Sequence, residues 1–269
     1  MNLPIKKIVL SLALLGLVSC GPSAGKLTDA QKQVIMDVST SASRVDTTAS
    51  AGSSKAPSGR FQLPGMFAFA AKTAASADTS TDANLQKMSD KLQKAFDKGD
   101  CTATSAGSTV TVAGAACPIS LSITISSASS GSAKIVFVYS TSDADMKSYN
   151  DIDGINLTIT SSTSSDAASN TISMVMGMDG KLTSQKYGDI GVSMNMNMTM
   201  SKATSASKSS LNGNGEMKIT FSNFLVDVKS KIVNGVATYN LNGEDMTEAQ
   251  LSQYFAGLNS KVSTSSSNP

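Results

Sequence analysis

Residues 119–126 read Ile-Ser-Leu-Ser-Ile-Thr-Ile-Ser, and this stretch decides how the rest of the chain is interpreted. Successive side chains of a β-strand point to opposite faces, so the alternation places every aliphatic group on one face and every hydroxyl on the other. A strand with a single apolar face is typical of an antiparallel sheet that is buried on one side. The stretch therefore predicts such a sheet, with a second face rich in hydroxyl groups.

The same two-residue period returns along the chain that follows. Tight hairpin turns are indicated by Asp179-Gly180 and Asn234-Gly235, and a change of parity at Ser222-Asn223 indicates a further turn or a bulge. We expect a turn there, and we expect consecutive strands to pair as a meander from about Thr109 onward. The alternating segments are 133–139, 155–159, 172–178, 192–200, 217–221 and 224–228.

Helical spacing lies on both sides of the strands. Capping boxes, in which a threonine is followed three residues later by glutamine, predict that helices begin at Thr28 and Thr247. An apolar stripe from Leu85 to Phe96 predicts another helix, which Gly99 should end. We also expect a short helix over 64–75, a flexible linker over 49–60 and a disordered tail over 261–269.

The N-terminus carries an export signal. Lys6 and Lys7 precede an apolar run over 8–18, which is too short to cross a bilayer as a helix. Leu17-Val18-Ser19-Cys20 resembles the lipobox of bacterial lipoproteins. This resemblance implies cleavage before Cys20, transfer of diacylglycerol to its thiol, and acylation of the new amino terminus with a fatty acid such as palmitate. Since aspartate is absent from position 21, the resemblance also implies an outer-membrane location.

The composition disfavours one class of partner, and the number of cysteines predicts a disulfide. Without Lys6 and Lys7, 20 of the 22 basic residues remain against 20 acidic ones, and aromatic residues make up 5% of the chain. This balance disfavours a nucleic-acid partner. In an oxidising compartment, Cys101 and Cys117 are expected to form a disulfide once Cys20 is lipidated.

Enzymatic motifs are not recognisable. The chain has no histidine, which removes the usual triads and most zinc sites. Four carboxylates at 143, 145, 151 and 153 are interpreted as a solvated turn, because their loop lacks the aromatic residues that usually stack on sugars. Asp151-Ile152-Asp153-Gly154 resembles a fragment of a calcium loop but lacks the glutamate at the twelfth position and the full ligand set. We expect no enzyme and no cofactor.

Methionines occupy one face of two predicted strands, where three interpretations are open. Thioethers can ligate Cu(I), but same-face neighbours on a strand lie about 6.8 Å apart. Methionine also fills irregular cores, and a partly open methionine face would suit an acyl chain. The candidate ligand-binding residues are Met174, Met176, Met178, Met194, Met196 and Met198.

These patterns together predict an α+β, mainly β protein. We expect about eight to ten strands in a curved antiparallel meander or unclosed barrel, with two to four covering helices. Over about residues 80–260 this architecture is similar to unclosed β-barrel lipoproteins that carry lipids. The leading interpretation is a non-enzymatic outer-membrane lipoprotein that binds an apolar ligand; the alternative is a structural or surface-interaction lipoprotein with a packed core. The expected organisation is 1–19 signal peptide, 20–80 acylated N-terminus, helix and tether, 81–260 β domain, and 261–269 tail.

Overall fold

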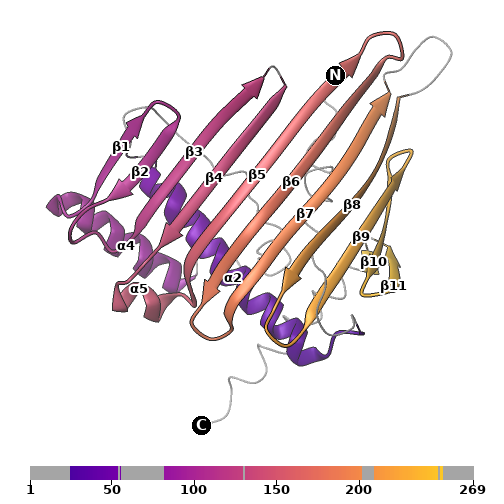
Figure 1. The fold of residues 1–269 in the computed structure, drawn as a ribbon. Coiled ribbons are helices and arrows are strands. Elements are labelled where there is room, and N and C mark those ends of the chain that lie inside the picture. The colour runs from indigo at the N-terminus through magenta and orange to yellow at the C-terminus, as the bar shows by residue number, and fades with distance from the viewer. Residues whose placement is uncertain are drawn as a thin grey trace.

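One open antiparallel sheet dominates the computed structural model (Figure 1). The structure describes residues 25–53, 55, 82–129, 131–201, 209–247 and 249–250. Eleven strands lie side by side in the order in which they occur along the chain, so that β1 and β11 form the two edges. The predicted class, a mainly β meander that does not close, is confirmed, with one strand more than expected.

The strands lengthen toward the middle of the sheet and shorten at both edges. Three described helices accompany them: α2 (Asp29–Ser53), α4 (Ala83–Lys98) and α5 (Ala144–Tyr149). The strands are β1 (Thr102–Ala106), β2 (Thr109–Ala113), β3 (Ser120–Ser129), β4 (Ser132–Ser140), β5 (Ile152–Asp166), β6 (Thr171–Ser184), β7 (Gly188–Ser201), β8 (Ser210–Thr220), β9 (Leu225–Val233), β10 (Val236–Leu241) and β11 (Glu244–Thr247).

The two faces of the sheet differ in the way that the alternation predicts. One face, here called the core face, carries buried side chains such as Leu121, Phe137 and Leu157. Helix α2 runs across this side, behind the sheet in Figure 1, and its Val38 and Val45 belong to the same buried cluster. The opposite face, here called the open face, carries the polar half of each alternating segment.

Helix α2 begins where the sequence predicts and ends later. The side chains of Thr28 and Gln31 exchange the bonds of a capping box, with the Thr28 N–H donating to Gln31 Oε1 at 2.9 Å. The linker expected over 49–60 is wrong for its first five residues, which are helical. Small side chains allow this: Ala49 is fully buried, and a Cβ on Gly52 would lie 3.4 Å from Leu92.

Helix α4 confirms the most regular helical pattern in the sequence. Asp82 caps its first turn by accepting bonds from the N–H groups of Asn84 and Leu85. Gly99 ends it in the left-handed conformation, with φ at 78°, a region that glycine enters without a steric penalty. Arg44 of α2 binds the same Asp82 through Nε at 2.7 Å, which joins the two helices.

Of the predicted turns, two are correct and one is wrong. Asn234-Gly235 connects β9 to β10 with positive φ at both residues, and Ser222-Asn223 lies between β8 and β9. Asp179-Gly180 is not a turn, because both residues lie within β6. Gly180 is required there for close approach of two strands, since a Cβ would lie 2.1 Å from the carbonyl oxygen of Asn156 on β5.

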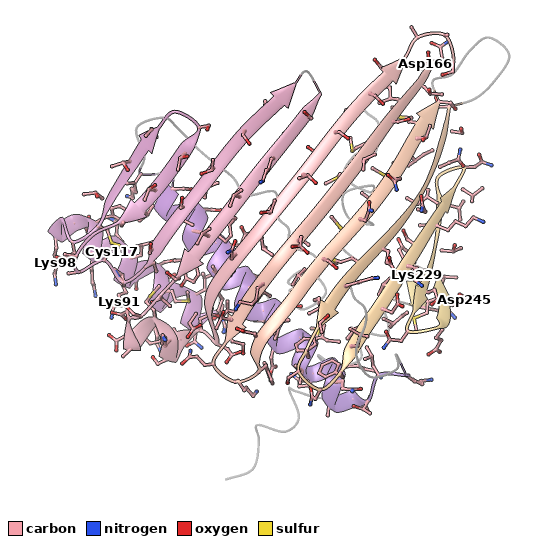
Figure 2. The ribbon with its side chains drawn as sticks, in the orientation of Figure 1. Lys91, Lys98, Cys117, Asp166, Lys229 and Asp245 are labelled. Atoms are coloured by element: carbon pink, nitrogen blue, oxygen red, sulfur yellow. A yellow bond between two sulfur atoms is a disulfide. The ribbon has the colours of Figure 1, made fainter. Side chains whose placement is uncertain are left out.

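The expected disulfide is present at one corner of the sheet. Cys101 and Cys117 are bonded, with their Cα atoms 4.7 Å apart. They flank the β1–β2 hairpin, at the end of the sheet where Figure 2 labels Cys117. Strand β1 itself was not predicted, because Thr102–Ala106 has short side chains and no apolar alternation strong enough to identify it.

Some predictions lie outside the described residues. These are the helix over 64–75, the body of the helix after Thr247, and the tail over 261–269. The capping bonds of that last helix are present, since the N–H of Thr247 donates to Gln250 Oε1 at 2.8 Å.

No described helix is both long enough and apolar enough to cross a membrane.

Helix α2 contains an acidic group whose titration should affect stability. In the part of the chain that the structure describes, the buried Oδ1 of Asp46 has no hydrogen-bond partner. Burial raises the pKa of Asp46 from 3.8 to about 7. Above about pH 4 the unfolded chain therefore loses a proton that the folded state retains. The contribution of Asp46 to the free energy of unfolding is complete below that pH and is lost as the pH rises through about 7.

Replacing this carboxyl should remove the pH dependence that it causes. We compare the free energies of unfolding of Asp46→Asn and the wild type. When the pH is raised from about 5.5 to about 8.5, their difference should change by about 1 to 2 kcal/mol in favour of the variant, because only the wild type must bury a charge at the higher pH. Urea unfolding of both proteins at the two pH values measures the difference. An equal stability difference at both pH values would contradict the assignment.

Candidate functional site

The methionines predicted as a site lie together on the core face. Strands β6 and β7 pair so that three couples of methionines stand directly opposite one another. Since paired residues of an antiparallel sheet project to the same face, the six side chains form one continuous cluster. The couples are Met174 with Met198, Met176 with Met196, and Met178 with Met194.

Burial divides this cluster. Met196 is 1% exposed and Met198 is 7% exposed, whereas the other four methionines are partly buried, and three of these, Met174, Met176 and Met178, pack against the core. Strand β8 leaves space for the Met198 side chain, because the residue opposite Met198 is Gly213. A Cβ added at Gly213 would come 3.1 Å from Met198 Cγ. The centre of the methionine strand is therefore packed protein interior.

A hollow near the methionine strands opens on the other side of the sheet. Its volume is about 510 Å³, and its lining includes Thr158, Thr160 and Ser193, whose side chains belong to the polar half of the alternation. Gly177 forms part of its floor, and a Cβ there would come 2.8 Å from Thr160 Oγ1. Val175, Met176, Met178 and Met194 also line it, so this hollow is a depression on the open face with a mixed polar and apolar lining.

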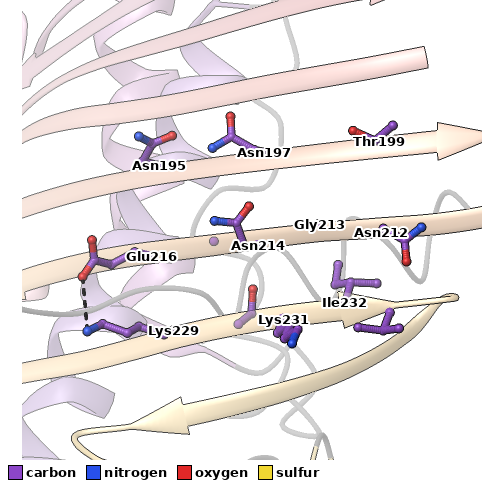
Figure 3. Close-up of a pocket in the computed structure, with 13 residues that line it drawn as sticks. Asn195, Asn197, Thr199, Asn212, Gly213, Asn214, Glu216, Lys229, Lys231 and Ile232 are labelled. Atoms are coloured by element: carbon purple, nitrogen blue, oxygen red, sulfur yellow. Dashed lines mark ion pairs between the residues drawn. The ribbon is translucent and has the colours of Figure 1, made fainter. Parts of the chain in front are cut away.

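A larger hollow of about 850 Å³ continues across β7, β8 and β9 (Figure 3). Asn195, Asn197 and Asn214 present amide groups along it, and Asn197 is paired directly with Asn214. Asn195 and Glu216 line both hollows, so the two form one depression. These amides were not predicted as a site, although they are the polar half of the same alternation that places the methionines on the other face.

Charges along this depression are balanced. Glu216 lies 3.2 Å from Lys218 Nζ on its own strand and 3.8 Å from Lys229 Nζ on the next strand. Lys229 also lies 3.8 Å from Asp227. Because both signs alternate over a short distance, the open face has no strong field that would attract a highly charged polymer.

The interpretation of the four carboxylates as a solvated turn is wrong in part, because Asp145 lies in helix α5, Asp153 lies in strand β5, and all four carboxylates make structural contacts. Asp143 caps α5 and lies 2.7 Å from Lys91 Nζ. Burial alone would raise the pKa of Asp143, but the bonds from Lys91 and the N–H of Met146 hold it below its ordinary value. Asp145 also binds Lys91, Asp153 binds Lys147, and Asp151 accepts a bond from the N–H of Lys186.

The described residues can be searched for a metal site, but they do not include the predicted lipidation site. Within the described ranges, no group of three or more histidine, cysteine, aspartate or glutamate side chains is arranged to hold a metal ion. Cys20, the expected lipidation site, lies outside the described residues. The lipid anchor therefore stays a prediction from the sequence.

The fold defines this chain as a mainly β protein built on a single meander sheet. Residues 108–250, more than half of the chain, match the family of phage tail tube protein FII, and the chain belongs to that family. The match runs from the start of β2 to the residues after β11, and leaves out α2, α4 and β1. No curated protein and no solved structure matches the chain.

Proposed function

We propose that this protein is a non-enzymatic structural module that is tethered to the outer membrane through a lipid on Cys20 and associates with further copies of itself. Membership of a family named for a tail tube protein supports this proposal, because a tube is built from repeated subunits. The burial of Met196 and Met198 supports it as well, since packed interior cannot receive a ligand.

The free edges of the sheet are the observation that carries the proposal. Strand β1 has the sequence Thr-Ala-Thr-Ser-Ala, with no charge and no proline, and no described strand pairs with its outer edge. Proteins that remain monomeric usually protect such an edge with charged residues or proline. Strand β11 forms a different edge that contains Glu244 and Asp245. Contact between two unlike edges is head-to-tail, and it builds a ring or a filament.

A charge on the unprotected edge should weaken this association. We expect Thr104→Lys to weaken self-association by at least about tenfold, because the ammonium group would lie where another strand must pair. Sedimentation velocity over a concentration series, with chains that begin at Gly21, measures the effect. Ser164→Lys is the matched control, since Ser164 is also exposed on a strand but lies within β5. A wild type that stays monomeric at every concentration would refute the proposal.

The membrane tether is tested separately. We expect Cys20→Ser to abolish incorporation of a labelled fatty acid and to leave an uncleaved precursor, because only the thiol accepts the diacylglycerol. Metabolic labelling followed by gel electrophoresis measures both results. Persistent label on the Cys20→Ser chain would refute the tether and leave the association of the sheet unaffected.

A second candidate function is binding of an apolar, lipid-like ligand on the methionine cluster. The partial burial of Met174, Met176, Met178 and Met194 favours it, because these side chains keep some accessible surface beside the packed centre. Methionine adapts to ligands without a fixed shape. Uptake of a fluorescent fatty acid by the wild type is the result that this candidate requires.

A further inference from the structure

A third hollow, of about 580 Å³, lies at the end of the sheet where helix α2 approaches the β6–β7 turn and the end of α5. Its volume falls within the range of about 300–1,000 Å³ that is usual for small-molecule sites. It does not touch the methionine cluster or the depression on the open face. Its walls are built by residues 37–44, 147–151 and 185–187, which are distant in the sequence, together with Asn84 of α4.

Helix α2 presents a polar stripe to this hollow. Asp37, Thr40, Ser41 and Arg44 all line it. Their spacing of three, four and seven residues places them on one side of the helix, next to the apolar stripe that packs against the sheet. The polar stripe therefore faces a cavity between elements.

The walls of the hollow are held in place before any ligand arrives. Asp37 accepts bonds from Tyr187 Oη at 2.6 Å and Lys186 Nζ at 2.9 Å, which tie α2 to the β6–β7 turn. Burial would raise the pKa of Asp37, but these bonds and one from Gln33 lower it. Asp151 fixes the other end of the turn by accepting from the N–H of Lys186 and from Ser184 Oγ. Both carboxylates are thus occupied structurally.

Other polar groups in the hollow retain bonding capacity. Asn150 is 3% exposed, and its Nδ2 donates to the carbonyl oxygen of Ile152, but its buried Oδ1 has no partner among the described residues. An unsatisfied buried acceptor is costly, so a small movement of the Asn150 side chain that brings Oδ1 to a hydroxyl donor in the hollow would be stabilising. Arg44 uses Nε for Asp82 and Nη1 for the carbonyl oxygen of Tyr149, which leaves further guanidinium donors.

Two aromatic rings complete the lining. Tyr149 and Tyr187 both belong to the hollow, and each ring has a lysine over one face, with Lys87 Nζ 5.4 Å from the centre of the Tyr149 ring and Lys186 Nζ 4.8 Å from that of Tyr187. The segment of the four carboxylates was predicted to lack the aromatic residues that stack on sugars, but it contributes Tyr149, and folding adds Tyr187 from a separate turn. An apolar ring surface beside amide and guanidinium donors matches a sugar, which has both apolar C–H faces and a rim of hydroxyls.

The charges of the hollow favour a neutral ligand. Arg44, Lys147 and Lys186 carry positive charge, but they are paired with Asp82, Asp153 and Asp37 at 2.7, 3.0 and 2.9 Å. A phosphate or carboxylate would have to compete with these pairs, whereas a neutral hydroxyl would not. We propose that this hollow binds a neutral saccharide of one or two units. It is a binding site without catalysis, because both of its carboxylates are engaged.

Amide-resolved NMR titration of the chain from Gly21 onward tests the proposal. The probes are N-acetylglucosamine, its β-1,4 disaccharide, galactose and maltose, with acetate and inorganic phosphate as anions. We expect at least one saccharide to bind with a Kd of about 1 mM or tighter. The shifted amides should lie in 147–151 and 185–187. Shifts only for acetate or phosphate, shifts confined to other segments, or no shift with any saccharide would overturn the proposal.

A matched pair of variants on α2 locates the site independently. Thr40→Phe should fill the hollow and weaken saccharide binding by at least about tenfold, whereas Thr47→Phe should not change it. Thr47 lies on the same helix, is exposed, and does not line the hollow. Circular dichroism shows whether each variant is folded, and Thr40→Arg replaces Thr40→Phe if the latter does not fold. Equal affinity of the folded Thr40 variant and the wild type would reject the site.

Discussion

Truncation of Met196 to alanine is expected to destabilise the protein by about 2 to 5 kcal/mol. This side chain is 1% exposed at the centre of the methionine cluster, so its removal loses apolar burial and leaves a cavity. Urea unfolding of the chain from Gly21 onward measures the change. Met194→Ala is the matched control on the same strand and face. It should cost clearly less, because Met194 is only partly buried.

Fatty-acid uptake decides between the two candidate functions. A ligand on the partly buried methionines would lose affinity in Met194→Ala, whereas a structural module would take up no fatty acid. A full cost, together with no uptake by the wild type, would leave the structural module. A small cost at Met196 would contradict the burial on which our first proposal rests.

Loss of the disulfide is expected to cost about 3 kcal/mol, the value for a loop of this length in the chain-entropy model. The bond closes a separation of 16 residues around the β1–β2 hairpin, and Cys101 is 3% exposed. Unfolding of a Cys101→Ser, Cys117→Ser chain in urea measures the cost. Reductant should lower the stability of the wild type toward that of the double variant and leave the variant unchanged. A double variant as stable as the oxidised wild type would contradict this account.

Alternation predicted the sheet and its two faces because a half-buried strand has a simple chemical signature. It placed Leu121 in the core and the six methionines together, as the structure has them. It could not distinguish a glycine in a turn from one at a close contact between strands, so Gly180 was misassigned. An Asp-Gly pair looks the same in a sequence whether the glycine lies in a turn or at a close contact between strands. Only the position of the neighbouring strand distinguishes the two cases.

The end of α2 and the third hollow depend on long-range packing. Ala49 and Gly52 have the composition of a linker, and they become helical because small residues let α2 approach Leu92 closely. Tyr187 and Asp37 are separated by 150 positions, so no local pattern joins them. The amides of the open face alternate with the methionines of β7, so one segment of sequence carries the pattern of both faces.

The order of the strands has a consequence for how the molecule forms. Each strand pairs only with the strands directly before and after it, so every hairpin closes a short loop, which costs little chain entropy and favours rapid folding. Helix α2 is the exception, because its bonds to Tyr149 and Lys186 span 105 and 149 positions. The sheet can therefore assemble hairpin by hairpin, while helix α2, which precedes every strand in the sequence, completes its contacts only after the β6–β7 turn has formed.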